Sequence, residues 1–222
     1  MGDRRSLGEM VAAQIDAYVA EHGPIDRVRH TVQLTSFGGS GSTALSAHLA
    51  AAGVDLPKTP GEFPFKHQRF PPPAADVPPG FRVVYPYADP RNAMLSIFRR
   101  SYGLGHFRGL QGRSPDAAAA ARLASLDAFL EGGVDDFELE DHVERWLEPR
   151  EYPVMFVRYE MLPRVWPTVR AFVGIEQPVP CLEMRERASA WKALPRSQRR
   201  RLNRIYGSLV RRLDALPDVH LT

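Results

Sequence analysis

The sequence has almost no cysteine and no long apolar run. Cys181 is the single cysteine among 222 residues, so no disulfide can form within the chain. No apolar run approaches the roughly 18 residues of a membrane-spanning helix. Met1 to Arg5 are not followed by the apolar core of a secretory signal. These absences argue against a disulfide-rich secreted domain and predict a cytoplasmic location without a membrane partner.

Positive charge is in small excess and is unevenly placed. The formal net charge is +3 and the isoelectric point is about 9.2. Arginines gather at Arg99 and Arg100, at 185–187 and at 196–204. Such patches suit an anionic ligand or a nucleic acid. Because few aromatic residues accompany the last run, we interpret it as a solvated helix face and predict no nucleic-acid partner.

A glycine-rich segment follows a short apolar stretch. Val32, Leu34 and Phe37 have the pattern of a short buried strand, and 44–52 has the composition of a helix. A strand, a glycine-rich turn and a helix direct several N–H groups and a helix N-terminus at one point, which suits a phosphate or sulfate. The residues of this predicted anion site are Gly38, Gly39, Ser40, Gly41, Ser42 and Thr43. The segment lacks the lysine of a nucleoside-triphosphate loop, and a flexible connection without ligand is the alternative.

Apolar spacing along the chain predicts alternating strands and helices. Strands are expected at 32–37, 81–87 and 152–158, and helices at 7–21, 44–52, 90–98, 114–132, 136–148, 162–173 and along the last segment. Such alternation favours parallel strands covered by helices. We therefore predict one α/β domain over 1–222, a central parallel sheet flanked by helices. Its peripheral parts are an N-terminal helix within 1–27, a proline-rich loop at 57–80 and a C-terminal helix at 195–222.

Three prolines constrain these elements. Pro86 cannot donate to a strand ladder, so we expect it at the C-terminal end of its strand. Pro163 and Pro167 are expected in the first turns of their helix.

Several segments in sequence order resemble the sulfotransferases that use 3′-phosphoadenosine 5′-phosphosulfate (PAPS). The run from Gly39 to Thr43 resembles the family's 5′-phosphosulfate loop, and Lys66-His67 before three prolines resembles its lysine, histidine and proline segment. The run 83–96 resembles the strand and helix that bind the 3′-phosphate, and 156–162 resembles a further strand end. The resemblance implies a P-loop-like sulfotransferase fold.

The resemblance also implies an activity. A sulfuryl group would pass from PAPS to a hydroxyl or amine of a small-molecule or glycan acceptor, leaving PAP as product and needing no metal. His67 would be the general base, with Lys66 as a second catalytic residue. Beyond the loop, the residues implied to bind the nucleotide are Arg91, Ser96, Tyr159, Arg185 and Arg187.

The histidines allow other interpretations. On the residue pattern alone, His67 fits a surface histidine as well as a base. His106 follows Gly103 and Gly105 and is a candidate for the acceptor entrance, whereas His142 is interpreted as structural.

Two positions depart from the family pattern. Gly39 stands where the loop has a basic residue, and Ala88 stands where an arginine pairs with the 3′-phosphate. Each lost charge-assisted contact is worth about 1.5–3 kcal/mol. Other cations can replace them, namely Lys66, Arg91, Arg99, Arg100, Arg185 and Arg187.

Two other functions therefore stay open. One is a non-catalytic nucleotide-binding relative, in which Gly39→Lys would be expected to raise activity. The other is an atypical nucleotide-dependent kinase, which the missing lysine and the lack of an obvious Mg²⁺-binding carboxylate disfavour.

Overall fold

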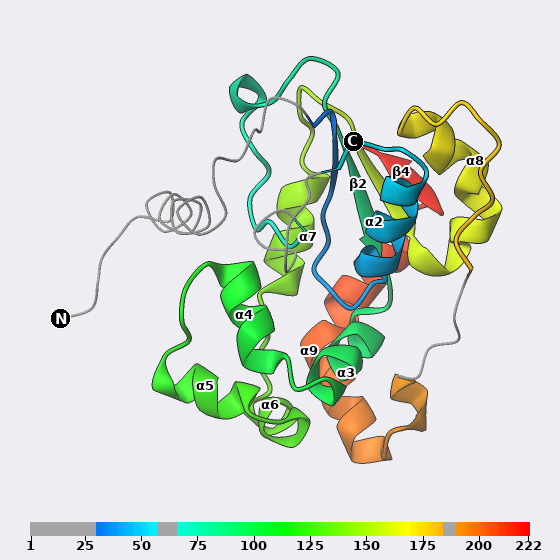
Figure 1. Cartoon of the computed structure of the whole chain (residues 1–222). Coiled ribbons are helices and arrows are strands. Elements are labelled where there is room, and N and C mark those ends of the chain that lie inside the picture. Colours follow the sequence, from blue (N-terminus) through cyan, green and yellow to red (C-terminus); the bar gives the residue numbers. More distant parts are fainter. Residues whose placement is uncertain (1–29, 57–65, 184–189) are drawn as a thin grey trace.

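The computed structural model describes residues 30–56, 66–183 and 190–222 (Figure 1). Within these residues the strands form one sheet in the order β1-β2-β3-β4. Strands β1 (Val32–Leu34), β2 (Arg82–Tyr87) and β3 (Val154–Arg158) are parallel, whereas β4 (Val219–Leu221) is antiparallel to β3. The predicted α/β class is confirmed, with a mostly parallel sheet flanked by helices.

Helices connect the strands and cover both faces of the sheet. They are α2 (Ser42–Ala51), α3 (Pro90–Arg99), α4 (Gly103–Gln111), α5 (Ala117–Leu123), α6 (Leu126–Gly132), α7 (Leu139–Leu147), α8 (Leu162–Phe172) and α9 (Arg196–Asp214). Short 3₁₀ turns are η1 (Ala74–Asp76), η2 (Tyr159–Met161) and η3 (Trp191–Ala193). No helix of the described residues is long and apolar enough to cross a bilayer.

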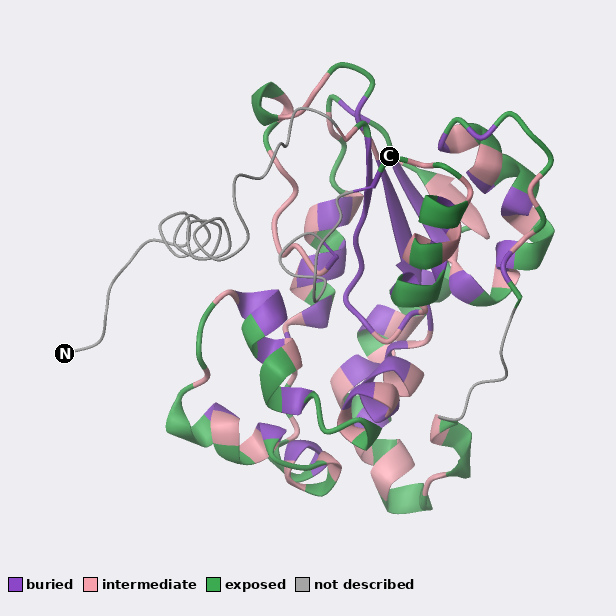
Figure 2. Ribbon diagram, in the orientation of Figure 1, coloured by how far each residue is buried: buried purple, intermediate pink, exposed green. Residues whose placement is uncertain are grey.

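The sheet separates two apolar cores because successive strand side chains point to opposite faces. In β2, Val83 and Tyr85 join the core under α3 to α7 and α9, whereas Val84 joins the core under α2 and α8. In β3, Phe156 and Val157 divide in the same way. Figure 2 shows the parallel strands buried on both faces, as the continuous apolar runs predict.

Local capping explains where several helices begin. The Asp89 side chain accepts from the Arg91 N–H at 2.9 Å, with Pro90 at the first helical position, as the sequence predicts. The single helix predicted over 114–132 is wrong. It is two helices, because Ser125 caps α6 by accepting from the Ala128 N–H at 3.1 Å.

Other expectations need correction as well. The last segment is not all helix, since β4 follows α9, and α4 was not predicted. Pro163 and Pro167 lie in the first two turns of α8, as expected. Pro86 lies next to the end of β2, where β1 no longer pairs with it, close to its expected place. The helix expected within 1–27 and the part 57–65 of the proline-rich loop lie outside the described residues.

Two segments flank the end of β1, one on each side of it. The Thr35 N–H donates to the Val84 carbonyl of β2 at 3.1 Å, and the next N–H, that of Ser36, donates to the Lys66 carbonyl at 2.9 Å. Because successive N–H groups of an extended chain point to opposite sides, Lys66 lies on the side of β1 away from β2. In open α/β sheets, ligands bind outside the carboxyl ends of the strands, and β1 ends here.

Candidate functional site

The glycine-rich loop leads from β1 into α2 through left-handed backbone. Gly38, Gly39 and Gly41 have φ values of +88°, +63° and +79°, and Gly41 directly precedes α2. The Gly38 N–H donates to the Ser36 hydroxyl at 3.1 Å. The loop therefore ends at a helix N-terminus, whose unpaired N–H groups and dipole suit an anion.

Each of these glycines is also the point where another element touches the loop. A Cβ at Gly38 would lie 2.1 Å from Cε1 of His106 on α4. At Gly39 it would lie 2.7 Å from the Ala93 Cα of α3, and at Gly41 it would lie 2.0 Å from Cε2 of Tyr159. These distances are shorter than any real Cβ contact, so only glycine permits this packing.

The two departures from the family pattern fall where a long side chain has no room. Gly39 packs on the backbone of α3. Ala88 is 2% exposed and belongs to the core under α2 and α8. A lysine at Gly39 would therefore require a shift of α3, and the expectation that it raises activity stays a prediction.

Lys66 brings a cation to the loop from the neighbouring segment. Its ammonium donates to the Thr43 hydroxyl in the first turn of α2, and the residue is 6% exposed. An ammonium at a helix N-terminus opposes the usual preference, because that end carries partial positive charge. An anion bound between the two would be stabilised by both.

His67 is held so that one ring nitrogen is available. Its Nδ1 lies 2.9 Å from the Ser36 carbonyl. A carbonyl only accepts, so Nδ1 carries the hydrogen and Nε2 keeps its lone pair. Burial is the main cause that lowers the pKa of His67 to about 4; the charges of Lys66 and Arg100 act in the same direction, and the Ser36 hydrogen bond opposes them. The ring is neutral at pH 7 and able to accept a proton at Nε2.

His106 lies beside His67 in the opposite tautomer. Its Nε2 donates to the Phe37 carbonyl at 2.8 Å, and the two rings meet edge to face at 5.0 Å between centroids. Burial lowers the pKa of His106 to about 3. Neighbouring carbonyls of the loop, Ser36 and Phe37, thus orient both histidines.

The other residues expected at the site divide into three groups. Tyr159 touches the loop at Gly41, and Ser96 lies one turn beyond Ala93 on the same helix. Arg91 is held elsewhere. It binds both carboxylate oxygens of Asp89 through its guanidinium, and it lies 3.8 Å from the Trp191 ring centroid. Arg185 and Arg187 lie outside the described residues.

Sequence reasoning missed the contributions of Ser36 and Phe37 and the contact of His106 with His67. Ser36 and Phe37 act through backbone carbonyls, which every residue has, so no residue pattern marks them. His142 is buried on α7 with Nδ1 2.8 Å from the Tyr85 hydroxyl, and burial lowers its pKa to about 3. Among residues 30–56, 66–183 and 190–222 there is no cluster of three or more metal-ligating side chains.

Comparison with known proteins leaves the family unassigned. No family model matches the chain, and no curated protein matches it. Among solved structures, mouse sulfotransferase SULT7A1 complexed with PAP is similar, with 18% identity and a TM-score of 0.40. The similarity covers 88% of this chain and 67% of that chain. A similarity this low carries no functional argument.

Gly39→Lys is expected to destabilise the protein. The new side chain would meet Ala93 in a left-handed backbone, and we expect a loss of about 1–3 kcal/mol in the free energy of unfolding. Denaturant unfolding measures it. Gly53→Lys is the matched control, because Gly53 has φ +88° but nothing within 4 Å of its Cβ. Equal losses in both variants would contradict the close contact at Gly39.

Acid is expected to destabilise the fold below about pH 6.5. The pKa values of His67, His106 and His142 are lowered by burial from 6.5 to about 4, about 3 and about 3. Their contribution to stability is complete above pH 6.5. It is lost as the pH falls, because the histidines of the unfolded chain bind protons at a pH where those of the folded chain stay neutral.

One buried acid opposes this trend. Burial raises the pKa of Asp135 from 3.8 to about 6, so its protonation favours the fold in acid. The net uptake on unfolding from these four groups is about two protons, equivalent to about 2–3 kcal/mol per pH unit between pH 6 and 5. Urea unfolding at several pH values tests this, and a flat profile would contradict the buried histidines.

Proposed function

We propose that the chain is a PAPS-dependent sulfotransferase, which transfers a sulfuryl group to a hydroxyl or amine of a small-molecule or glycan acceptor and releases PAP. One observation carries the proposal. The glycine-rich loop leads into the N-terminus of α2. The segment that bonds to this loop carries the Lys66 ammonium and the unprotonated Nε2 of His67. The family resemblance of the sequence selects sulfuryl transfer among reactions of anionic donors.

The residues of the loop suit the phosphosulfate of such a donor. The N–H groups leading into α2, with Ser42 and Thr43, would bind its oxygens. Within the described residues the Ser40 hydroxyl is buried without a hydrogen-bond partner, so a donor is available in the loop. Lys66 would take the place of the basic residue absent at Gly39.

The chemistry then assigns a role to each group. PAPS supplies an activated sulfuryl group whose S–O bond to the phosphate breaks as the acceptor oxygen or nitrogen bonds to sulfur. His67 accepts the acceptor proton at Nε2. Lys66 and the loop N–H groups stabilise the charge that develops on the leaving phosphate. Bound negative charge raises the pKa of His67 toward neutrality and makes it a better base.

The 3′-phosphate would be bound at α3. Ser96 and Arg91 are proposed contacts on that helix, with Arg185 and Arg187 beyond the described residues. Arg91 would have to exchange part of its pairing with Asp89 for the phosphate. A cytoplasmic location, inferred from the single cysteine, stays a prediction.

One observation favours a second candidate. Arg91 is already engaged by Asp89 and Asn203. This favours a non-catalytic relative that binds nucleotide weakly through the loop alone.

Calorimetric titration with PAP, using ATP·Mg²⁺ as the comparison, separates these functions. We expect micromolar PAP affinity without comparable ATP affinity. Tighter binding of ATP·Mg²⁺ would instead favour the kinase alternative. Absence of PAP binding at millimolar concentration would overturn the donor site.

Replacing Lys66 and His67 separately tests their distinct roles. His67→Ala is expected to keep PAP affinity and lose turnover, because it removes the base and no donor contact. Lys66→Met is expected to lower the transfer rate about 10²–10³-fold, the usual effect of losing one preorganised donor. Arg164→Met removes the same charge from a residue whose side chain is 75% exposed on α8 and is the control. Transfer unchanged in His67→Ala would remove His67 from the mechanism.

A further inference from the structure

Glu138 has a backbone conformation that glutamate rarely adopts. It immediately precedes α7 with φ +52°, in the left-handed region. Its side chain does not cap the helix. Asp135 does so instead, since its side chain accepts from the Leu139 N–H at 2.7 Å and its carbonyl accepts from the Glu138 N–H at 3.1 Å. Helix capping therefore leaves the glutamate side chain unexplained.

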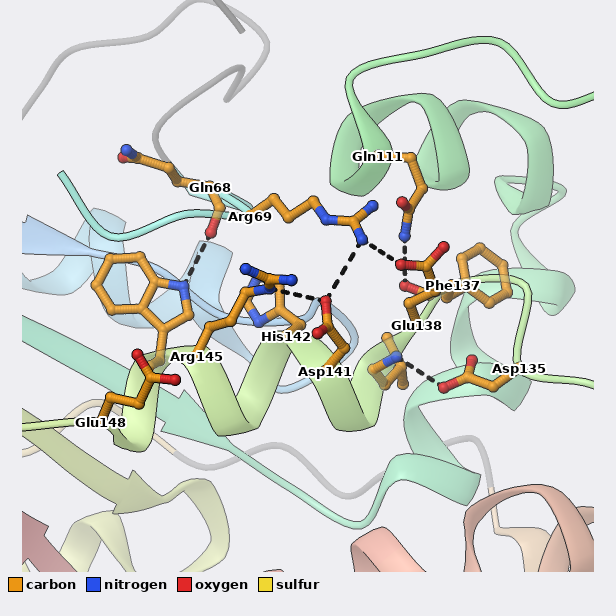
Figure 3. Close-up of polar contacts among 12 residues, drawn as sticks. Gln68, Arg69, Gln111, Asp135, Phe137, Glu138, Asp141, His142, Arg145 and Glu148 are labelled. Atoms are coloured by element: carbon orange, nitrogen blue, oxygen red, sulfur yellow. Dashed lines mark hydrogen bonds and ion pairs between the residues drawn. The ribbon is translucent and has the colours of Figure 1, made fainter. Parts of the chain in front are cut away.

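The side chain of Glu138 forms an ion pair with Arg69. Its carboxylate pairs with the Arg69 guanidinium, which also lies 3.4 Å from the Asp141 carboxylate (Figure 3). Asp141 is in turn bound by Arg145 at 2.8 Å. Burial alone would raise the pKa of Asp141, but Arg145 and Arg69 outweigh it and lower the pKa. Arg69 thus contacts two carboxylates, that of Glu138 just before α7 and that of Asp141 in the first turn of α7.

Arg69 follows His67 by two residues in a segment without helix or strand. The segment 66–69 is placed by contacts along its length. Lys66 accepts from Ser36. The Gln68 side chain accepts from Gln33 at 2.7 Å, and its carbonyl accepts from the Trp146 indole at 3.0 Å (Figure 3). At the end of this segment, the Arg69 side chain is 14% exposed and holds the segment to Glu138 through its charge.

We propose that Glu138 is a positioning residue, which acts through Arg69 to fix the segment that carries Lys66 and His67. The inference rests on the proposed function, because that function gives Lys66 and His67 their roles. A left-handed glutamate persists where the surroundings require its side chain. Here the requirement is the Arg69 contact, which sets the distance of His67 from the Ser36 carbonyl and of Lys66 from Thr43.

If the Glu138–Arg69 ion pair only stabilised the fold, the disturbance of the site would follow the loss of stability. Two variants separate these two effects. Glu138→Ala and Glu138→Gly both remove the carboxylate, but only glycine suits φ +52°. We expect Glu138→Gly to be more stable than Glu138→Ala in thermal unfolding. We expect both to disturb the site equally.

Two measurements report the geometry of the site, the ¹⁵N signals of the His67 ring and the kinetics of transfer. Imidazole ¹⁵N signals, assigned to His67 with His67→Gln, report the Nδ1–H tautomer in the whole protein without substrate. Both Glu138 variants should broaden or shift that signal. Transfer kinetics should show kcat lowered about 10–100-fold, with a smaller change in KM for PAPS, because the reacting groups are misplaced while the loop is kept.

Control and coupling variants complete the experiment. Glu144→Gln removes a carboxylate of α7 that pairs with Arg212 at 3.1 Å, and should leave the His67 signal unchanged. Arg69→Met combined with Glu138→Gly should be no worse for that signal than Arg69→Met alone. Glu138→Gln, which keeps an acceptor for Arg69, should recover part of the wild-type signal and kcat.

The outcomes distinguish this inference from the proposed function. A His67 signal unchanged in both Glu138 variants would overturn the positioning role. So would additive effects of the Arg69 and Glu138 replacements. If the wild-type protein transfers no sulfuryl group and binds no PAP, the proposed function fails, whereas the His67 signal still tests whether Glu138 fixes the segment.

Discussion

The close approach at three glycines is the constraint on which the site depends. Without side chains at 38, 39 and 41, the loop after β1 lies against α4, α3 and η2 at once. Ala93 belongs to one apolar core and Tyr159 to the other, so the loop touches residues of both. Position 39 faces Ala93, so no long side chain fits there. The positive charge beside the loop comes from Lys66, whose ammonium donates to the Thr43 hydroxyl.

The electrostatics of the site follow from that arrangement. Lys66, the N-terminus of α2 and Arg100 are all positive, and the charges of Lys66 and Arg100 act on His67 and His106. Burial keeps both rings neutral, so two uncharged imidazoles lie beside concentrated positive charge. Such a concentration of positive charge favours an anionic ligand. It supports the proposed phosphosulfate donor.

Stability and positioning are divided between neighbouring residues at the start of α7. Asp135 caps the helix and accepts from Tyr206 of α9 at 2.8 Å, so it serves the fold. Glu138 has an unfavourable backbone and reaches Arg69, three residues from Lys66. Strain accepted at one residue and compensated at another is typical of sites where geometry matters more than local preference. The helix on one face of the sheet is thereby linked to the loop at its edge.

The strand and helix alternation, the Asp89 cap and the glycine-rich loop could be predicted from the sequence, because apolar period, capping chemistry and backbone freedom are local properties. It did not predict β4 or α4, whose short segments depend on the sheet edge and on the site they pack against. The break at Ser125 was hidden by the strong helix preference of the alanines before it. The lack of room for a side chain at Gly39 and the contact of Lys66 with Thr43 became visible in the folded chain alone. The same is true of the Ser36 and Phe37 carbonyls, which orient two histidines. The reason is physical: these contacts join residues far apart in the chain, and their distances depend on how whole elements pack.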